Sequence, residues 1–276
     1  MIGAFDSGHG GLTILRALTA RLPDRDFLYF GDHAHAPYGE RTSPEIVALT
    51  RDAVTLLFDR GCKLVVLACN TAAAVALRTL QQDWLPAYAP DRRILGVLVP
   101  TVEAVTGVPW LADATTTRAH TIALFATRRT VASCAYPDEI KKRAPGIRLV
   151  QHACVGLATL IEQGATRDEL REAVQGHVRE LMAELGGRAP DAVMLGCTHY
   201  PLVADLFAEA LPPGIEIVSQ PDIVARSMTE YLARHPQIDT PGRGDIQFLT
   251  SGDPASAGHF ATTFFGRAAT FTRIAG

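Results

Sequence analysis

Short apolar runs alternate along the chain with longer stretches in which apolar residues recur every three or four positions. The short runs are rich in β-branched and aromatic residues and predict buried strands, whereas the longer pattern predicts helices with one apolar face. Because strands and helices alternate throughout, we expect an α/β protein with parallel sheets flanked by helices. Strands are predicted at 2–5, 27–30, 64–68, 94–98, 121–125, 147–151, 192–196, 215–218 and 245–250. Helices are predicted at 12–22, 44–60, 72–83, 101–107, 131–143, 157–163, 167–185, 221–233 and 254–264.

Two of the predicted strands end in the same way. The apolar run that begins at Val65 stops at Cys69 and enters an alanine-rich helical pattern, and the run that begins at Ala192 stops at Cys197 in a similar turn. In open parallel sheets, ligands bind at the carboxyl ends of the strands. The repeat therefore predicts two similar parallel-sheet domains with pseudo-twofold symmetry and an interdomain active-site cleft, with one thiol on each wall.

The domain boundaries follow from this repeat and from the linker pattern of residues 211–214. We assign residues 1–97 plus 208–276 to an N-terminal α/β domain that the C-terminal segment closes. Residues 98–207 are assigned to the second α/β domain.

Composition restricts the partner and the compartment. The net charge is −3, and the charges are mixed along the chain, so we expect neither a nucleic-acid partner nor a membrane partner. No apolar run approaches the roughly 18 residues of a membrane span, and the N-terminus lacks a leader pattern, so a cytoplasmic protein with a small-molecule substrate is expected. The odd number of scattered cysteines favours free thiols, and three of them are predicted to be small buried hydrophobic residues: Cys62, Cys134 and Cys154.

The first strand leads into a glycine turn, residues 6–11, before a helix. This turn resembles half of a dinucleotide fingerprint, with Asp32 near the place of a ribose-binding acid, but Thr13 stands where the third glycine belongs. We favour a different use, in which backbone N–H groups and the Ser7 hydroxyl meet a carboxylate at the helix N-terminus. The polar loop that follows Asp32 is predicted to bind a ligand, and its histidines, His33 and His35, are expected to be solvated. No metal site is predicted, because this loop offers too few ligands.

A thiol just before a helix lies near the positive end of the helix dipole, which favours the thiolate. A thiolate and a thiol on opposite walls suit stereoinversion by proton transfer, in which one removes an α-proton and the other delivers a proton to the opposite face. Pyridoxal phosphate would require a Schiff-base lysine, and the three lysines, Lys63, Lys141 and Lys142, lie in poor positions for one. We therefore expect no cofactor. Asn70, Thr71 and Thr198 could donate hydrogen bonds to a carboxylate, and Asp6 and His199 could tune the thiols.

Several motifs, in order along the chain, resemble those of glutamate racemase. They are Phe5-Asp6-Ser7-Gly8, Gly10-Gly11-Leu12-Thr13, Tyr29-Phe30-Gly31-Asp32, Ala36-Pro37-Tyr38-Gly39, Ala68-Cys69-Asn70-Thr71-Ala72 and Leu195-Gly196-Cys197-Thr198-His199-Tyr200-Pro201-Leu202, with a weaker match at Thr250-Ser251-Gly252-Asp253. The resemblance implies a cofactor-independent enzyme that interconverts L- and D-glutamate for peptidoglycan, usually as a homodimer. By the same resemblance, Cys69 and Cys197 would be the acid/base thiols, assisted by Asp6 and His199. The residues that would contact substrate are Asp6, Ser7, Tyr38, Gly39, Asn70, Thr71, Thr198 and His199.

The chain departs from this family pattern at Val99, His35, His9 and residues 218–220. Aspartate is the nearest rival substrate, but related aspartate racemases tend to carry an acidic residue in place of His199, so His199 favours glutamate. Two other classes stay open from the sequence: a nucleotide-dependent oxidoreductase and a non-catalytic protein that binds a ligand in the cleft.

Overall fold

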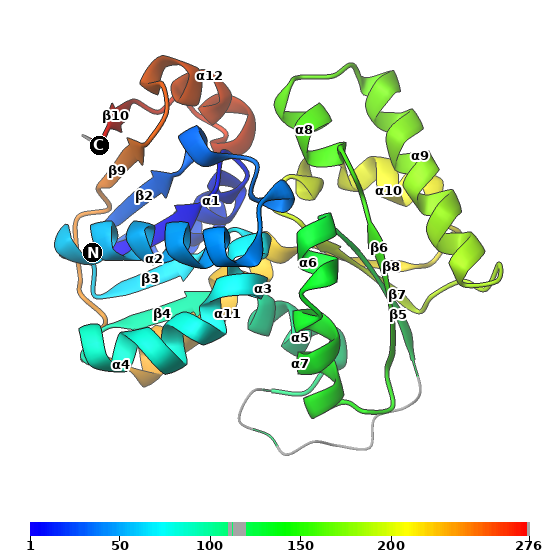
Figure 1. Cartoon of the computed structure of the whole chain (residues 1–276), viewed down its shortest axis with the longest axis horizontal. Helices are drawn as coiled ribbons and strands as arrows, with labels where there is room; N and C mark the ends of the chain where they lie inside the picture. The colour runs from blue at the N-terminus through cyan, green and yellow to red at the C-terminus, as the bar shows by residue number, and fades with distance from the viewer. Residues whose placement is uncertain (110–111, 113–119, 275–276) are drawn as a thin grey trace.

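The computed structural model describes residues 1–109, 112 and 120–274, and the chain forms two α/β domains side by side (Figure 1). Each is built on a parallel sheet. The larger sheet contains β1 (Ile2–Asp6), β2 (Phe27–Gly31), β3 (Leu64–Leu67), β4 (Arg93–Gly96), β9 (Ile246–Thr250) and β10 (Phe271–Arg273). The smaller sheet contains β5 (Thr121–Ala126), β6 (Arg148–Ala153), β7 (Ala192–Gly196) and β8 (Glu216–Val218).

Helices connect the strands and cover the sheets. Those of the larger domain are α1 (Gly11–Arg21), α2 (Ser43–Asp59), α3 (Asn70–Thr79), α4 (Leu85–Tyr88), α11 (Gln220–Arg234) and α12 (Pro254–Phe265). Those of the smaller domain are α5 (Leu98–Thr106), α6 (Arg128–Ala132), α7 (Ala135–Arg143), α8 (Leu157–Glu162), α9 (Arg167–Glu184) and α10 (Ala204–Ala210). None of the described helices is both long enough and apolar enough to cross a membrane.

The two sheets share one strand order. In the larger sheet β1 lies between β2 and β3, and β4 follows β3; in the smaller sheet β5 lies between β6 and β7, and β8 follows β7. Each cysteine turn therefore follows the third strand of its own domain. The predicted fold class, two similar parallel-sheet α/β domains, is confirmed.

The C-terminal part of the chain contributes to both sheets. Strand β8 pairs in parallel with β7, so residues 216–218 lie in the smaller sheet. On the sequence alone they were assigned, with the rest of segment 208–276, to the N-terminal domain. Strands β9 and β10 extend the larger sheet beside β2, as the expected closure by the C-terminal segment requires. The exact boundaries stay a prediction.

Alternate side chains of the smaller sheet build two apolar layers. Leu124 and Met194 point to the face that α5 and α7 cover, whereas Phe125 and Leu195 point to the face under α9 and α10. Strand side chains alternate between faces, so a run that is buried at every position needs helices on both sides. This explains why these strands read as continuous apolar runs in the sequence.

Several local predictions were wrong. The helix predicted at 131–143 is broken at Cys134, which has a φ of 57° and an exposed side chain, so this cysteine is not a small buried hydrophobic residue. The helix predicted at 44–60 begins at Ser43, and its N-cap is Thr42, which forms a capping box with Glu45. A short helix, α4, lies between the helix predicted at 72–83 and the strand predicted at 94–98, where no element was predicted, and β10 was not predicted either.

Candidate functional site

A single cavity between the two domains receives both cysteine turns. Its volume is about 90 Å³, room for several water molecules at roughly 10–15 Å³ each. The loops after β1 and β3 line it from the larger domain, and the loops after β5, β6 and β7 line it from the smaller one. Of the residues predicted for the site, those that line the cavity are Ser7, Tyr38, Gly39, Cys69, Asn70, Thr71, Cys197, Thr198 and His199.

Cys69 is held at the N-cap of α3. Its Sγ accepts a hydrogen bond from the Ala72 N–H at 3.4 Å and lies 3.4 Å from the Ser7 hydroxyl. The sequence predicted a thiol that ionises readily, but burial and the neighbouring Asp6 raise the pKa of Cys69 to about 12. Cys69 is therefore a protonated thiol in this structure, suited to donating a proton. Once deprotonated, it would be a strong base.

Cys197 stands in a different local environment. A short 3₁₀ turn, Tyr200–Val203, follows it before the short helix α10, so the predicted helix-dipole effect does not carry over to this turn. Its Sγ lies 3.6 Å from Nδ1 of His199, and the other nitrogen of that ring lies 2.8 Å from Oε1 of Glu162. The thiol of Cys197, the imidazole of His199 and the carboxylate of Glu162 therefore form a connected series of polar groups at the cavity wall.

Glu162 and His199 stabilise each other's charged forms. Burial disfavours the carboxylate, yet the hydrogen bond from His199 and the nearby ring of His9 lower the pKa of Glu162 far below its usual range. Burial likewise disfavours the imidazolium, but Cys197 and Glu162 raise the pKa of His199 well above its usual value. His9 Nδ1 lies 3.5 Å from the same oxygen of Glu162. His9, one of the residues that depart from the family pattern, therefore contacts the carboxylate that holds His199 beside Cys197.

Asp6 is fully buried behind the cavity and is not among the residues that line it, so the predicted direct contact of Asp6 with substrate does not fit its position. One carboxylate oxygen accepts a hydrogen bond from the Gly8 N–H, and the other lies 3.5 Å from the Thr198 hydroxyl. Burial raises the pKa of Asp6, while His199 and the backbone N–H groups act in the opposite direction. From this position the charge of Asp6 acts on Cys69 and raises the pKa of that thiol.

Asn70 lines the cavity, but most of its amide is already engaged. Its Nδ2 donates to Gln220 at 2.6 Å, and its Oδ1 accepts from the Tyr136 hydroxyl at 2.8 Å and from Gln220. Gln220 also donates to Thr101 at 2.9 Å. The buried amide of Gln220 therefore joins Asn70 of the larger domain to Thr101 of the smaller one.

The domains also meet at the cavity itself. The Thr71 hydroxyl lies 3.0 Å from that of Thr127, which is the N-cap of α6. On the opposite side, a Cβ on Gly10 would clash with the side chains of Thr198 and His199. Glycine is therefore needed here for the close approach of the first glycine turn to the second cysteine turn.

The hydrogen-bond acceptor sites of the Asp32 carboxylate are occupied by neighbouring side chains. It accepts hydrogen bonds from the Tyr38 hydroxyl at 2.6 Å and from the Ser251 hydroxyl at 2.6 Å, and it pairs with His35. These contacts occupy the carboxylate that a ribose would need, which argues against the nucleotide-binding alternative. Asp32 instead fixes Tyr38 in the cavity wall.

His33 is largely buried, in contrast to the expected solvated position. Its Nδ1 lies 2.8 Å from the Thr250 hydroxyl, and its ring packs 4.2 Å from that of His9. Burial, with a contribution from His9, lowers the pKa of His33 to about 4. Since an unfolded histidine titrates near 6.5, the folded state takes up fewer protons between these values.

This burial predicts a loss of stability in acid. As the pH falls from 7 to 5, the unfolded state alone protonates at His33, which lowers the free energy of unfolding by about 2 kcal/mol. In His33→Asn, which keeps a polar group for Thr250, we expect the difference between pH 7 and pH 5 to shrink by that amount in urea denaturation. The exposed His259→Asn serves as the matched control. An unchanged difference in His33→Asn would contradict the prediction.

The residues that sequence reasoning missed belong to no motif. Glu162 ends α8, Gln220 begins α11, and Arg128 begins α6 and lines the cavity as an exposed cation. Each stands at one end of a helix. For one of them the sequence does hold a signal: Glu162 is a charged residue on an otherwise mostly apolar helix.

The fold and the cavity define a class: a two-domain α/β enzyme that holds a thiol from each domain in one interdomain site. A sequence model of the family described as Asp/Glu/hydantoin racemase matches residues 12–228, and the chain belongs to this family. The predicted resemblance is thereby confirmed, as is the prediction of an enzyme of the racemase class.

Individual relatives agree with this assignment. The chain is 48% identical to a glutamate racemase of Phenylobacterium zucineum, with 96% of each chain covered. Its structure is similar to that of a glutamate racemase from Bacillus anthracis, with a TM-score of 0.84, 28% identity, and 100% of this chain and 97% of the other covered. A glutamate racemase of Francisella tularensis, solved in complex with D-glutamate, matches with a TM-score of 0.83 and 25% identity over 99% and 97% of the two chains.

Proposed function

We propose that this chain interconverts L- and D-glutamate without a cofactor, using Cys69 and Cys197 as its two acid/base groups. The observation that carries the proposal is the placement of the two thiols: each follows the third strand of its own domain, and both line one cavity. The relatives named glutamate racemase support the choice of substrate.

In the proposed reaction, one cysteine acts as a thiolate and removes the α-proton of glutamate. The electron pair of the broken C–H bond is left on the α-carbon and delocalises into the adjacent carboxylate. The opposing cysteine, as a thiol, then donates its proton to the other face of the carbon and becomes the thiolate. The reverse reaction exchanges the two roles, so each enantiomer has its own base.

Residues around the thiols support these roles. For the Cys197 half, His199 bears the proton next to the sulfur, and Glu162 stabilises the imidazolium. For the Cys69 half, the Ser7 hydroxyl and the Ala72 N–H face the sulfur and stabilise the thiolate when it forms.

The substrate carboxylates have several candidate partners. Hydroxyl donors on Ser7, Thr71 and Thr198 line the cavity, and Arg128 offers a positive charge at its exposed side. Preorganised donors of this kind stabilise the charge that develops on a carboxylate during proton removal. Lys63, Lys141 and Lys142 are not among the described residues that line the cavity, in keeping with a mechanism that needs no Schiff base.

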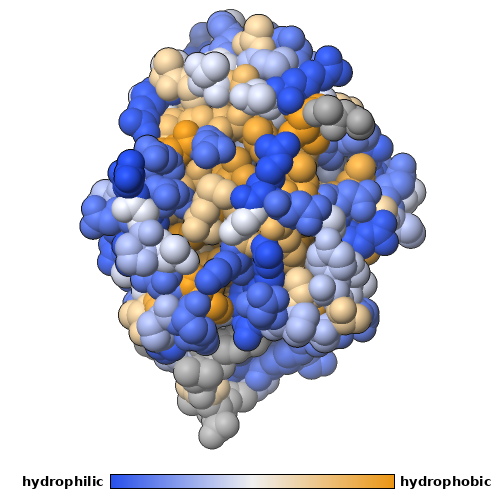
Figure 2. Space-filling model, turned by 90° about the vertical axis from the view of Figure 1, so that its left-hand side faces the viewer, coloured by the Kyte–Doolittle hydropathy of each residue, from blue (hydrophilic) through white to orange (hydrophobic). Residues whose placement is uncertain are grey.

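We further propose that the chain works in the cytoplasm as a homodimer and supplies D-glutamate for peptidoglycan. These roles rest on the resemblance to glutamate racemase. Hydrophobic side chains gather near the middle of one face of the molecule, within a rim of hydrophilic ones, and this face could receive a second copy (Figure 2). Light scattering after gel filtration measures the oligomeric state.

The test of the activity is α-proton exchange in heavy water, followed by NMR with purified protein and no added cofactor. L-glutamate, D-glutamate and the two enantiomers of aspartate are compared. We expect deuterium to enter both glutamates together with optical inversion. Exchange of aspartate alone would move the substrate to the rival amino acid, and a folded sample that exchanges none of the four would overturn the proposal in favour of a non-catalytic binding protein.

A further inference from the structure

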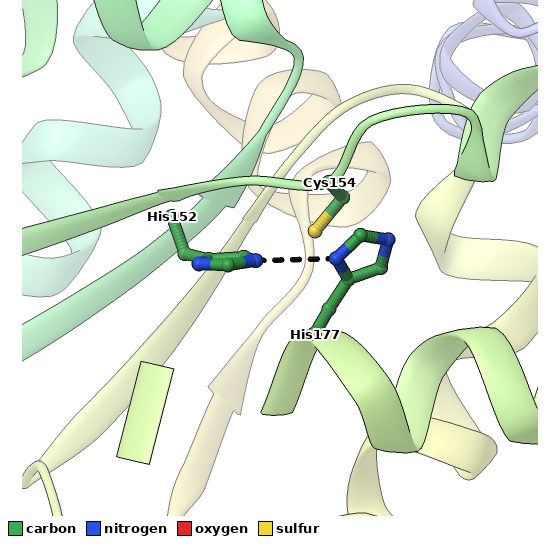
Figure 3. A group of neighbouring side chains, drawn as sticks. All are labelled: His152, Cys154 and His177. Carbon is green, nitrogen blue, oxygen red and sulfur yellow. Dashed lines mark hydrogen bonds between the residues drawn. The ribbon is translucent and has the colours of Figure 1, made fainter. Parts of the chain in front are cut away.

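A cluster of three side chains that could ligate a metal ion lies at the edge of the cavity in the smaller domain. His152 in β6, Cys154 just after that strand and His177 in α9 place their donor atoms within 4.8 Å of one another (Figure 3). His152 Nε2 and His177 Nδ1 are 3.1 Å apart, and the sulfur of Cys154 points toward the contact between the two rings. His152 and Cys154 are both buried.

Local structure explains why these three side chains converge. Residues two apart on a strand project to the same face, so the His-x-Cys pair at the end of β6 points toward one helix. That helix is α9, which packs on β6 and presents His177. The arrangement is therefore fixed by regular elements and not by a loop.

We propose that His152, Cys154 and His177 bind a thiophilic divalent cation, with Zn²⁺ as the cation that best fits the ligands. Zinc binds nitrogen at about 2.0–2.1 Å and sulfur at about 2.3 Å, which places tetrahedral ligands roughly 3.3–3.8 Å apart. The two nitrogens, 3.1 Å apart, are slightly closer than this range, and all three donor atoms lie within 4.8 Å of one another, so only small movements of the side chains are needed to reach it. Two imidazoles with one thiolate form a ligand set typical of zinc and not of magnesium or calcium.

Two carboxylates complete the surroundings. Glu180 Oε2 lies 3.5 Å from Nε2 of His152, and Glu184 Oε1 lies 3.5 Å from Nδ1 of the same ring. Glu180 stands one helical turn after His177, and its side chain is 69% exposed, so it can swing in as a fourth ligand. Glu184 is placed to accept a hydrogen bond from the Nδ1–H of His152 and orient its ring.

The cluster is joined to the wall of the cavity. Cys154 itself lines the cavity, as do Val155 and Gly156 after it, and α8 then leads to Glu162. The Tyr200 hydroxyl donates to the carbonyl oxygen of Cys154 at 3.5 Å, which links the cluster to the second cysteine turn. A bound cation would therefore fix the strand end from which this wall departs. This inference does not depend on the proposed racemase activity.

The test measures metal content directly. The protein used is the full chain with Cys69→Ser and Cys197→Ser, so that these two thiols cannot bind the metal. It is dialysed against Zn²⁺, and the bound metal is then counted by mass spectrometry. Co²⁺ replaces Zn²⁺ in a parallel sample, because a thiolate ligand gives it a charge-transfer band in the near ultraviolet. We expect about one metal ion per chain, the cobalt band, and a rise in Tm on adding zinc.

Further variants assign the ligands. Adding Cys154→Ser should abolish the cobalt band and weaken zinc binding roughly tenfold or more, and His177→Asn should weaken binding while the Cys154 thiol remains. Two matched controls, Cys134→Ser at the exposed cysteine and His235→Asn at the half-buried histidine that follows α11, should leave binding unchanged. Circular dichroism checks the fold, and His177→Asn decides the question if Cys154→Ser does not fold. The proposal is overturned if the starting protein binds no stoichiometric zinc, or if the folded ligand variants bind as tightly as the controls.

Discussion

Cys69→Ser and Cys197→Ser are each expected to lose racemisation of glutamate by roughly 10²–10⁴-fold, the usual contribution of a general acid or base. The substitution replaces sulfur with oxygen and keeps nearly the same shape. A serine hydroxyl, however, holds its proton far more tightly than a thiol and cannot become the base near neutral pH. Each variant therefore lacks the acid/base group on one face of the α-carbon.

The remaining thiol makes the prediction sharper. It can still remove and return the α-proton of the enantiomer that faces it, so each variant should exchange deuterium into one enantiomer of glutamate without inversion. The two variants should show opposite preferences. Inversion is followed by circular dichroism and exchange by NMR, on the same samples.

Cys134→Ser is the matched control, since Cys134 is an exposed thiol on the same domain as Cys197 and lies outside the cavity. It should racemise glutamate at the normal rate. Thermal unfolding confirms that the two site variants are folded. Full racemisation by either one would sink the two-thiol mechanism.

Glu162→Gln is the second variant for which we expect a large effect. Glutamine preserves the shape but removes the charge 2.8 Å from His199, so the imidazolium loses a partner that raises its pKa. The protonated ring is then less populated at alkaline pH, at a cost of up to roughly 10²-fold, the lower end of the usual contribution of a general acid or base. Racemisation should fall accordingly, mainly through kcat, because Glu162 positions and charges His199 while other residues hold the carboxylates.

The pH profile separates this role from a merely structural one. Loss of the His199 proton limits activity on the alkaline side, so a lower pKa moves that limb toward neutral pH in Glu162→Gln. The exposed Glu172→Gln on α9 serves as the control and should keep the original profile. If Glu162→Gln lowers the rate equally at every pH, the charge of Glu162 does not act through His199.

The sequence was sufficient to predict two parts of the candidate site: the two similar cysteine turns and the glycine turn after the first strand. Cys69 and Cys197 end apolar strands, and Ser7 follows the first strand, so their convergence at strand ends follows from the rule for parallel sheets. The domain repeat was visible for the same reason, because the two cysteine turns have similar surroundings in the chain.

Tertiary contacts account for what the sequence could not predict. The raised pKa of Cys69 arises from burial and from Asp6, neither of which a local helix-dipole argument includes. Glu162 meets His199 only because α8 packs against the second cysteine turn, and no spacing along the chain announces that contact. The three residues of the proposed zinc site are likewise distant in sequence. His177 lies on a helix whose position cannot be predicted from the pair His152 and Cys154.

The buried amide of Gln220 has a consequence for motion. The chain passes between the domains before α5 and again before α11, and Gln220, at the second passage, hydrogen-bonds to Thr101, at the first, and to Asn70 and Tyr136 on either side. Both passages are thus joined by hydrogen bonds at one point, and we expect this point to be the pivot when the two domains rotate relative to each other. When the cleft opens to admit a ligand, we expect the contact between Thr71 and Thr127 to separate first, while the pivot holds the two halves in register.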